Sequence, residues 1–354
     1  MLRADWIWGR DTSLSLRAAL APLGWLYGAA AGLHRGLYRS GLLRARELGI
    51  GVVSVGNLVV GGTGKTPLAA WVAAGLRDRG HRVVLASRGY GRRDRAGVRV
   101  VSDGRHVKES LITAGDEPLL LAAQLPGVPV MVGRDRGLLG LRAQSAFGAD
   151  VLVLDDGFQH HRLRRDVEVV SFDGGEGFGN ARCLPLGPLR EFPRALGAAH
   201  AVVVVDGPLR EVDEARVRAR VPQALRIEAR RQPESLRALG SGEVEAPECL
   251  MGREVGVLAG IARPAGFRRT LEALGARVIA ERYFPDHHRY RAADLRGLSE
   301  QASLWITTEK DAPKILPRFA VGSDLRVLRI RLVVEGEAGV LDWLESRLAQ
   351  RESR

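Results

Sequence analysis

The stretch Val52 to Thr66, VVSVGNLVVGGTGKT, is typical of a buried strand that runs into a phosphate-binding loop. Its valines suit the strand, and the glycines that follow let the backbone turn tightly, so that successive N–H groups point at phosphate oxygens. Lys65 adds a compact positive charge, and Thr66 offers a hydroxyl to the Mg²⁺ that travels with a nucleoside triphosphate. Residues 67–77 then predict a helix whose positive end faces the same anion. The expected nucleotide-binding residues are Gly61, Gly62, Thr63, Gly64, Lys65 and Thr66.

Val59 stands where the standard spacing GxxxxGK[ST] has its first glycine, so the motif is imperfect. The alternative is a glycine-rich turn between strand and helix that carries a solvated lysine. Lysine usage favours the phosphate loop, because only four of the 53 lysine and arginine residues are lysine. A lysine kept here indicates a need for a compact ammonium that a planar guanidinium cannot replace. The four lysines are Lys65, Lys108, Lys310 and Lys314.

The overall composition predicts a folded protein with an anionic partner. At 354 residues and 45% apolar side chains, the chain is long enough for two domains, each with its own core. Its formal charge of +12 implies attraction to nucleic acid, an acidic lipid surface or a phosphorylated substrate, and charge alone does not choose among them. The two cysteines, Cys183 and Cys249, are too few for a disulfide framework and lack metal-ligand spacing, which favours a reducing compartment.

Residues 1–50 have the composition of a membrane-surface segment. They hold seven arginines, three acidic residues and three of the six tryptophans, around an uncharged stretch of 16 residues from Ala18 to Leu33. That stretch is too short to span a bilayer, which takes about 20 apolar residues. We expect instead an amphipathic helix that lies at the headgroup level of a membrane. The alternative is a helix that packs on the protein's own core. The residues at helical spacing on the apolar side are Leu16, Leu20, Leu23 and Tyr27.

Apolar runs separated by helix-like segments predict a P-loop NTPase-like α/β core with a doubly wound parallel sheet over residues 51–225. The runs are continuous rather than alternating, which is typical of parallel strands covered on both faces. A second series of strands and helices begins near Val255 and predicts a smaller α/β domain over residues 226–354. Residues 226–252 have much of the composition of a linker, so we place the boundary there. The closing segment VLDWLESRLAQ predicts an amphipathic helix, for which packing back on the core of residues 51–225 is one possible arrangement.

Asp155 and Asp156 directly follow the apolar run 151–154. Carboxylates in this place emerge at the carboxyl edge of a parallel strand, where ligands bind in such sheets. Beside a phosphate loop, one of the two is expected to hold Mg²⁺ directly or through water, and the sequence does not say which. The alternative is a pair of turn residues at the end of a strand. Glu191, in the segment GPLRE, is a further candidate for supporting the metal.

Asp116 is a candidate proton acceptor. It precedes an apolar helix-like segment, so one interpretation is an N-cap that satisfies free N–H groups. The other is a carboxylate that accepts the proton of an attacking hydroxyl, as carboxylates do in kinases. His287, in a loop of the predicted second domain, offers an imidazole that orients or shares this proton. With the cation of the phosphate loop, the expected catalytic residues are Asp116, His287 and Lys65.

Six segments in this order resemble the tetraacyldisaccharide 4'-kinase family, the lipid A 4'-kinases of Gram-negative bacteria: VGNLVVGGTGKTP, GDEP, DDGFQHHRLRRD, GPLRE, FPDHHRY and TTEKDA. The resemblance spans nearly the whole chain and follows a basic, aromatic N-terminus. It implies ATP-dependent phosphorylation of the 4'-hydroxyl of a tetraacylated glucosamine disaccharide 1-phosphate. The implied place of this reaction is the cytoplasmic face of the inner membrane.

The resemblance also implies ATP and Mg²⁺ as cofactors and gives roles to individual residues. Val59 is similar to the family's own loop at that position, and His160 matches a motif position whose role stays open. The residues that match the phosphate and metal positions of the family are Lys65, Thr66, Asp155, Asp156 and Glu191. Those that match its proton-accepting dyad are Asp116 and His287.

Two other classes of function compete with a lipid kinase. A P-loop GTPase or metallochaperone-type NTPase that acts on a protein partner would share the loop, but no convincing base-reading motif supports it. A nucleic-acid-binding module is disfavoured, because the basic residues are spread along the chain without interleaved aromatic side chains. We therefore expect an acylated disaccharide 1-phosphate and the inner-membrane surface as partners, with no nucleic acid and no obligate protein partner.

Overall fold

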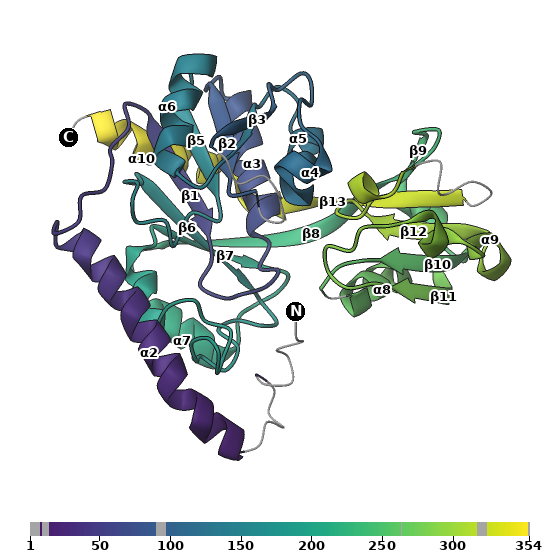
Figure 1. Cartoon of the computed structure of the whole chain (residues 1–354), viewed down its shortest axis with the longest axis horizontal. Helices are drawn as coiled ribbons and strands as arrows, with labels where there is room; N and C mark the ends of the chain where they lie inside the picture. The colour runs from purple at the N-terminus through teal and green to yellow at the C-terminus, as the bar shows by residue number, and fades with distance from the viewer. Residues whose placement is uncertain (1–7, 9–13, 90–96, 263, 317–323, 353–354) are drawn as a thin grey trace.

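The computed structural model describes residues 8, 14–89, 97–262, 264–316 and 324–352 (Figure 1). Of the predicted N-terminal segment, residues 1–7 and 9–13 lie outside this part. The described chain forms a larger and a smaller lobe that share one long sheet, with helix α2 (Leu14–Arg39) along the flank of the larger lobe.

One sheet of thirteen strands passes through both lobes. Its strands are β1 (Gly51–Gly56), β2 (Val83–Ser87), β3 (Arg99–Ser102), β4 (Val130–Val132), β5 (Val151–Asp155), β6 (Val167–Asp173), β7 (Ala201–Val205), β8 (Leu225–Ala238), β9 (Val244–Glu245), β10 (Glu254–Ala259), β11 (Arg277–Tyr283), β12 (Leu304–Thr308) and β13 (Asp324–Val334). Their order is β11-β10-β12-β13-β8-β7-β6-β1-β5-β2-β4-β3, and β9 pairs with β8.

The sheet of the larger lobe is doubly wound and parallel, as predicted. β1 lies between β5 and β6 and pairs with both in parallel, and β2, β4 and β7 continue the parallel array. β3 at the edge is antiparallel to β4. Every residue of β1 is buried, which a strand covered on both faces requires. The segments that follow β1 and β5 therefore meet at one carboxyl edge of the sheet.

Helices cover both faces of this sheet. Successive residues of a strand point to opposite faces, so neighbouring residues of β1 contact different helices. Val53 of β1 packs in a cluster with α3, α5 and α10, whereas Val52 packs on the other face with α6. The α-helices after α2 are α3 (Lys65–Asp78), α4 (Leu111–Ala114), α5 (Asp116–Gln124), α6 (Arg136–Phe147), α7 (Glu211–Arg220), α8 (Pro264–Ala273), α9 (Leu298–Gln301) and α10 (Glu337–Glu352). The 3₁₀ helices are η1 (Pro193–Ala198), η2 (Pro247–Leu250), η3 (Ala292–Leu295) and η4 (Ala312–Lys314).

β8 occupies the first half of the segment that the composition predicted to be a linker, and that prediction was wrong there. Residues 225–229 pair in parallel with β7, and residues 229–238 pair antiparallel with β13, so this strand belongs to both lobes. Buried and exposed residues alternate along much of it. A strand with one face in solvent carries polar residues at every second position, and that polar composition is what resembled a linker.

The smaller lobe continues the sheet and packs two helices around it. β10, β11, β12 and β13 pair in parallel, and their apolar residues form two clusters of their own with α8 and α9. The chain then returns to the larger lobe, where α10 packs on α3. Arg79 fixes this return through ion pairs with Asp342 at 2.5 Å and with Glu345 at 2.6 Å.

Helix α2 packs on the larger lobe through its small residues. A Cβ on Gly24 would lie 3.1 Å from the carbonyl oxygen of Cys183, and one on Gly28 would lie 2.6 Å from Cζ of Phe192. Several bulky apolar residues of α2 point away from this contact, with Trp25 67% exposed and Leu33 66% exposed. Leu16 and Leu20, which were expected on the membrane side, are instead partly buried. The helix thus contacts the protein through one face and presents an apolar face to its surroundings. In the described chain, no helix combines the length and hydropathy that crossing a bilayer requires.

Replacing Gly28 with leucine should lower the free energy of unfolding by about 1–3 kcal/mol, because the added side chain has no room beside Phe192. Gly36→Leu is the matched control, since a Cβ there meets nothing within 4 Å. Urea unfolding of both variants measures the difference. Equal midpoints would contradict the packing of α2 on the larger lobe.

Candidate functional site

The loop after β1 has the backbone of a phosphate-binding turn. Gly61 and Gly64 have φ angles of +130° and +77°, which glycine adopts without strain. A Cβ on Gly64 would also lie 3.1 Å from Cγ2 of Val205 on β7. α3 begins at Lys65, directly after Gly64, so the unpaired N–H groups of its first turn and its positive end face the loop. The predicted succession of strand, loop and helix is present.

Asn57, which the sequence analysis did not single out, holds the base of this loop. It is fully buried, and its Nδ2 donates to the carbonyl of Val59 at 2.6 Å and to Oγ1 of Thr63 at 2.8 Å. The Thr63 hydroxyl also lies 3.0 Å from that of Ser171, and its N–H donates to the carbonyl of Gly61 at 3.1 Å. Thr63 therefore shapes the loop through these contacts, and its predicted contact with a nucleotide stays a prediction. In the sequence, the signal for the role of Asn57 was that this asparagine directly follows the apolar run of β1.

Val59, the departure from the standard motif, belongs to a short bridge between two loops. It pairs antiparallel with Leu189, and the N–H of Val60 donates to the carbonyl of Pro188 at 2.8 Å. Its side chain is buried in the apolar cluster below α7. The segment 187–191 is thereby fastened to the phosphate loop, and a branched side chain suits this extended, packed position better than glycine does.

Asp155 and Asp156 have different partners at the end of β5. The carboxylate of Asp155 lies 3.2 Å from Oγ1 of Thr66. Burial raises the pKa of Asp155 to about 7, and the charge of Glu117 adds to the rise, whereas Lys65 opposes it. Asp156 instead pairs with Arg190 at 2.8 Å. Burial acts to raise the pKa of Asp156, but the charges of Arg190 and Lys65 outweigh it and hold that pKa below its usual range.

Glu191 does not join this group. Both of its carboxylate oxygens accept hydrogen bonds from Arg35 of α2, at 2.7 Å and 2.8 Å, and both side chains are buried. The guanidinium of Arg35 also lies over the ring of Phe158, 4.5 Å from its centroid. Glu191 thus ties α2 to the segment after β6, because the buried cation of α2 occupies its carboxylate. Its expected role beside the metal has no support in these contacts.

Asp116 and His287 come together from different lobes. Oδ2 of Asp116, at the start of α5, lies 2.8 Å from Nδ1 of His287. Gly115 occupies the N-cap and Asp116 is the first residue of the helix, so Asp116 is not the N-cap, although its Oδ1 accepts the N–H of Glu117 in the first turn at 3.1 Å. Burial acts to raise the pKa of Asp116, but the hydrogen bond and charge of His287 outweigh it and lower that pKa. The same hydrogen bond raises the pKa of His287.

The segment TTEKDA lies beside this pair. Lys310 is 3.1 Å from Oδ1 of Asp286 and 3.8 Å from Oε1 of Glu117. Glu309 accepts a hydrogen bond from Gln124 of α5 at 3.0 Å. These contacts join the smaller lobe to α5, so the segment forms part of the contact between the lobes.

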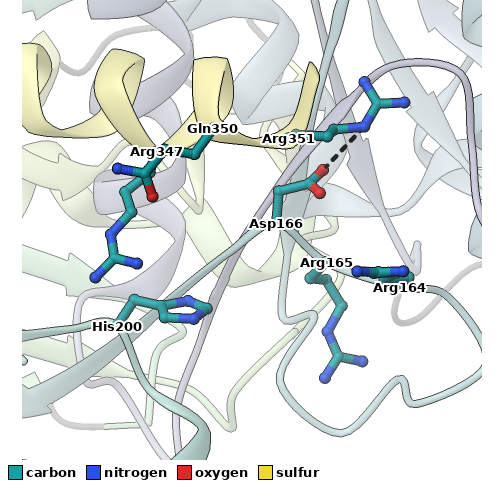
Figure 2. A pocket seen from close by; sticks show the side chains of 7 residues that line it. All are labelled: Arg164, Arg165, Asp166, His200, Arg347, Gln350 and Arg351. Carbon is teal, nitrogen blue, oxygen red and sulfur yellow. Dashed lines mark ion pairs between the residues drawn. The ribbon is translucent and has the colours of Figure 1, made fainter. Parts of the chain in front are cut away.

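A hollow of about 100 Å³ at the opposite edge of the sheet is not this site (Figure 2). Asp166 and His200, which line it, directly precede β6 and β7, and α10 closes its other side. Arg351 lies 3.8 Å from Asp166 and donates to the carbonyl of Leu48 at 2.5 Å. Arg165 in turn pairs with Glu168. The hollow is therefore the place where the end of α10 is fastened to the amino edge of the sheet.

No group of three or more histidine, cysteine, aspartate or glutamate side chains arranged to hold a metal occurs in the described residues. The geometry instead offers a hydroxyl and a buried carboxylate beside a phosphate loop, which suits a cation that arrives with a nucleotide. The charge of Glu117, the neighbour of Asp116, contributes to the raised pKa of Asp155 beside this loop. The pair of Asp116 and His287 therefore lies close enough to the loop for charges to interact. The phosphate loop and this pair are thus neighbours, and their roles as phosphate-binding site and proton acceptor stay predictions.

The profile of one protein family, tetraacyldisaccharide-1-P 4'-kinase, matches residues 16–349. The chain belongs to this family. The tetraacyldisaccharide 4'-kinase of Anaeromyxobacter dehalogenans (strain 2CP-C) is 48% identical over 326 residues, which are 89% of this chain and 86% of that protein. The enzyme of the same name from Syntrophus aciditrophicus (strain SB) is 41% identical over 303 residues, 80% of each chain.

A solved structure shows the same fold. The crystal structure of LpxK from Aquifex aeolicus in complex with ATP matches with a TM-score of 0.78 and 31% sequence identity, over 94% of this chain and 99% of that one. At this coverage the likeness extends over both lobes. The family resemblance of the six sequence segments and the predicted α/β fold are both confirmed.

Proposed function

We propose that this chain phosphorylates the 4'-hydroxyl of a tetraacylated glucosamine disaccharide 1-phosphate with ATP, a step of lipid A biosynthesis. The contact between Asp116 and His287 carries this proposal, because it supplies a proton acceptor for a hydroxyl next to a phosphate-binding loop. Membership of the 4'-kinase family supports the choice of lipid substrate. The ATP complex of the Aquifex aeolicus protein supports the choice of nucleotide.

The phosphate loop would hold the triphosphate through α3 and Lys65. The free N–H groups at the start of α3 and the charge of Lys65 bind phosphate oxygens without moving, so that charge developing during transfer meets donors already in place. Asp156 and Arg190 form a paired support behind this site. In this arrangement the loop orients the donor phosphate, and its lysine stabilises the negative charge.

Mg²⁺ is the cation that fits the oxygen ligands beside the loop. We assign it to Thr66 and Asp155, whose oxygens lie 3.2 Å apart, with nucleotide phosphates and water completing its shell. Mg²⁺ bound there supplies positive charge that neutralises the phosphate oxygens. Asp156 is the less suitable ligand of the two, because Arg190 occupies its carboxylate.

The proton of the lipid hydroxyl would pass to the pair of Asp116 and His287. Asp116 is ionised at neutral pH, since its pKa lies below the usual range. Its hydrogen bond to Nδ1 of His287 leaves Nε2 of the ring as the second nitrogen of the pair, 3.6 Å from Oδ2 of Asp286. A hydroxyl held between the pair and the phosphate loop would lose its proton to the pair as its oxygen bonds to the terminal phosphorus of ATP and the bond from that phosphorus to the leaving ADP breaks.

The exposed apolar face of α2 suits a lipid surface. Tryptophan and leucine side chains beside arginines are typical of segments that lie among headgroups. We infer that the protein binds the cytoplasmic face of the inner membrane through this face and draws its lipid substrate from there. The net charge of +12 adds attraction to anionic lipids.

Transfer of labelled phosphate from ATP to purified tetraacyldisaccharide 1-phosphate tests the proposed reaction. We expect the label on the lipid as a phosphate monoester. This label should stay on the lipid when the 1-phosphate is removed. Nucleotide hydrolysis without a labelled lipid would favour the alternative, an NTPase that acts on a protein partner. The same assay with GTP as donor separates the two nucleotides.

Thr66→Val should weaken Mg²⁺-dependent binding of ATP by about ten- to a hundredfold. Valine keeps the shape of threonine but removes the oxygen, and loss of a hydrogen bond to a charged group costs about 1.5–3 kcal/mol. Thr66→Ser, which keeps the hydroxyl, is the matched control and should bind nearly as the wild type does. Titration of ATP into both variants with and without Mg²⁺ measures the effect. A deficit that persists without Mg²⁺ would contradict the assignment.

A further inference from the structure

Lys314, which the reaction above does not use, lies in the wall of the proton-accepting pair. It ends η4 in the smaller lobe, and its side chain is only 2% exposed. Its Nζ is 3.9 Å from Oδ2 of Asp116, the same oxygen that lies 2.8 Å from Nδ1 of His287. Asp116 of the larger lobe is thus held between an imidazole and an ammonium that both belong to the smaller lobe.

Asp311 fixes the position of this ammonium. Nζ of Lys314 lies 2.7 Å from Oδ1 of Asp311, which is fully buried. The other oxygen of Asp311 accepts hydrogen bonds from the N–H of Gly260 at 2.9 Å and from Oγ1 of Thr308 at 2.8 Å. Gly260 directly follows β10 and Thr308 ends β12. The sheet of the smaller lobe therefore sets where the positive charge stands.

Three other charged groups face the pair. Lys310 is shared between Asp286 at 3.1 Å and Glu117 at 3.8 Å, and its side chain is 23% exposed. Asp286 also lies 3.6 Å from Nε2 of His287. Solvent and two carboxylates screen the charge of Lys310, whereas the charge of Lys314 is almost completely enclosed. The charges of both lysines lower the pKa of Asp116, that of Lys310 more than that of Lys314, and Lys314 is the one of the two that is enclosed beside Oδ2 of Asp116.

The choice of lysine at this position is itself informative. The chain uses arginine at 49 of its 53 cationic positions, and three of the four lysines lie at the site: Lys65 in the loop and Lys310 and Lys314 at the lobe contact. An enclosed space between two carboxylates suits a compact ammonium better than a planar guanidinium.

We propose that Lys314 is a positioning residue that keeps Asp116 ionised and aligned on His287 when the two lobes meet. This inference rests on the proposed role of the pair as proton acceptor. A neighbouring cation favours the charged carboxylate and disfavours the charged imidazole. The two groups titrate together, so loss of Lys314 makes the pair bind its proton more tightly. The cation thereby keeps the pair free to accept a proton at neutral pH.

The pH profile of kcat for Lys314→Met tests this role. We expect the acid limb to move to higher pH by about one unit, which lowers kcat about tenfold below the limb. Above the limb kcat should approach the wild-type value, and the KM for ATP should stay unchanged. Lys108→Met is the matched control, because Lys108 is 53% exposed and pairs with Asp103 on the surface. Its profile should equal that of the wild type.

An acid limb that stays in place, or a loss of kcat that is equal at every pH, would overturn the proposal. Asp116→Asn separates its failure from that of the proposed function. If Asp116→Asn keeps its kcat, the pair is not the proton acceptor, whatever Lys314 does. If Asp116→Asn is inactive and Lys314→Met has the wild-type profile, only the positioning role fails. Should Lys314→Met lose ATP binding through misfolding, Lys314→Gln is measured, with the same expected shift and the same contradicting results.

Discussion

Asp116→Asn is expected to lower kcat by about 10²- to 10⁴-fold, the usual contribution of a positioned general base. Asparagine keeps the shape of aspartate and accepts the backbone N–H of Glu117, which Oδ1 of Asp116 accepts at 3.1 Å. It removes the negative charge that faces His287. ATP affinity should stay at its wild-type value, since the phosphate loop follows β1 and Asp116 belongs to α5. Single-turnover transfer to the lipid and equilibrium binding of ATP measure the two effects separately.

Asp103→Asn is the matched control for this variant. Asp103 also accepts backbone N–H groups with its carboxylate, but it lies in a surface turn and pairs with Lys108. We expect its kcat to equal that of the wild type. Equal losses of kcat and ATP affinity in Asp116→Asn would instead mean that the carboxylate supports the fold of α5.

Replacing Trp25 and Leu33 together with glutamate should release the protein from anionic vesicles. Both side chains are exposed on α2, and burying a large apolar side chain contributes about 1.5–3 kcal/mol. The two changes therefore lower membrane partitioning at least about a hundredfold, and like charge on the lipids adds to the loss. ATP binding should be unaffected, because neither side chain packs on the core.

Val212→Glu supplies the comparison, since Val212 is 51% exposed and lies on α7 rather than on α2. Sedimentation with vesicles that contain anionic lipid measures all variants. Undiminished sedimentation of the α2 variant would contradict the membrane-binding face. Deleting α2 is a poorer experiment, because it would uncover Phe192 and leave the buried Glu191 without Arg35.

The parts of the fold that follow from local pattern could be predicted from the sequence. Continuous apolar runs predicted β1 and β5 correctly, and the glycines with Lys65 predicted the turn into α3. The site residues Asp155 and Asp156 could be placed at the carboxyl edge, because parallel strands align their ends. Their different partners could not, since Arg190 reaches Asp156 from a loop 34 residues away.

What the sequence did not show depends on contacts between distant segments. Asp116 and His287 are separated by 171 residues, so the residues alone offered this pair only as a candidate, and the family resemblance strengthened it. Glu191 was expected near the metal, but a cation on α2, 156 residues earlier, takes its carboxylate. The sequence predicted α2 as an amphipathic helix but did not indicate that its glycines form the packing face. The sequence indicated only that Lys314 is one of four lysines, because no local pattern indicates which carboxylate a lysine will contact.

The path of β8 and α10 determines the order in which the two lobes can be completed during synthesis on the ribosome. The larger lobe includes the last helix of the chain, whose Leu341, Leu344 and Leu348 pack in the same cluster as Val53 of β1. A growing chain that ends near residue 238 would contain β8 but would lack these leucines and the strand partner that β13 gives to β8. The nucleotide-binding lobe is therefore completed only after the smaller lobe has been synthesised. Incomplete chains would expose an unpaired strand edge, the kind of surface that chaperones protect.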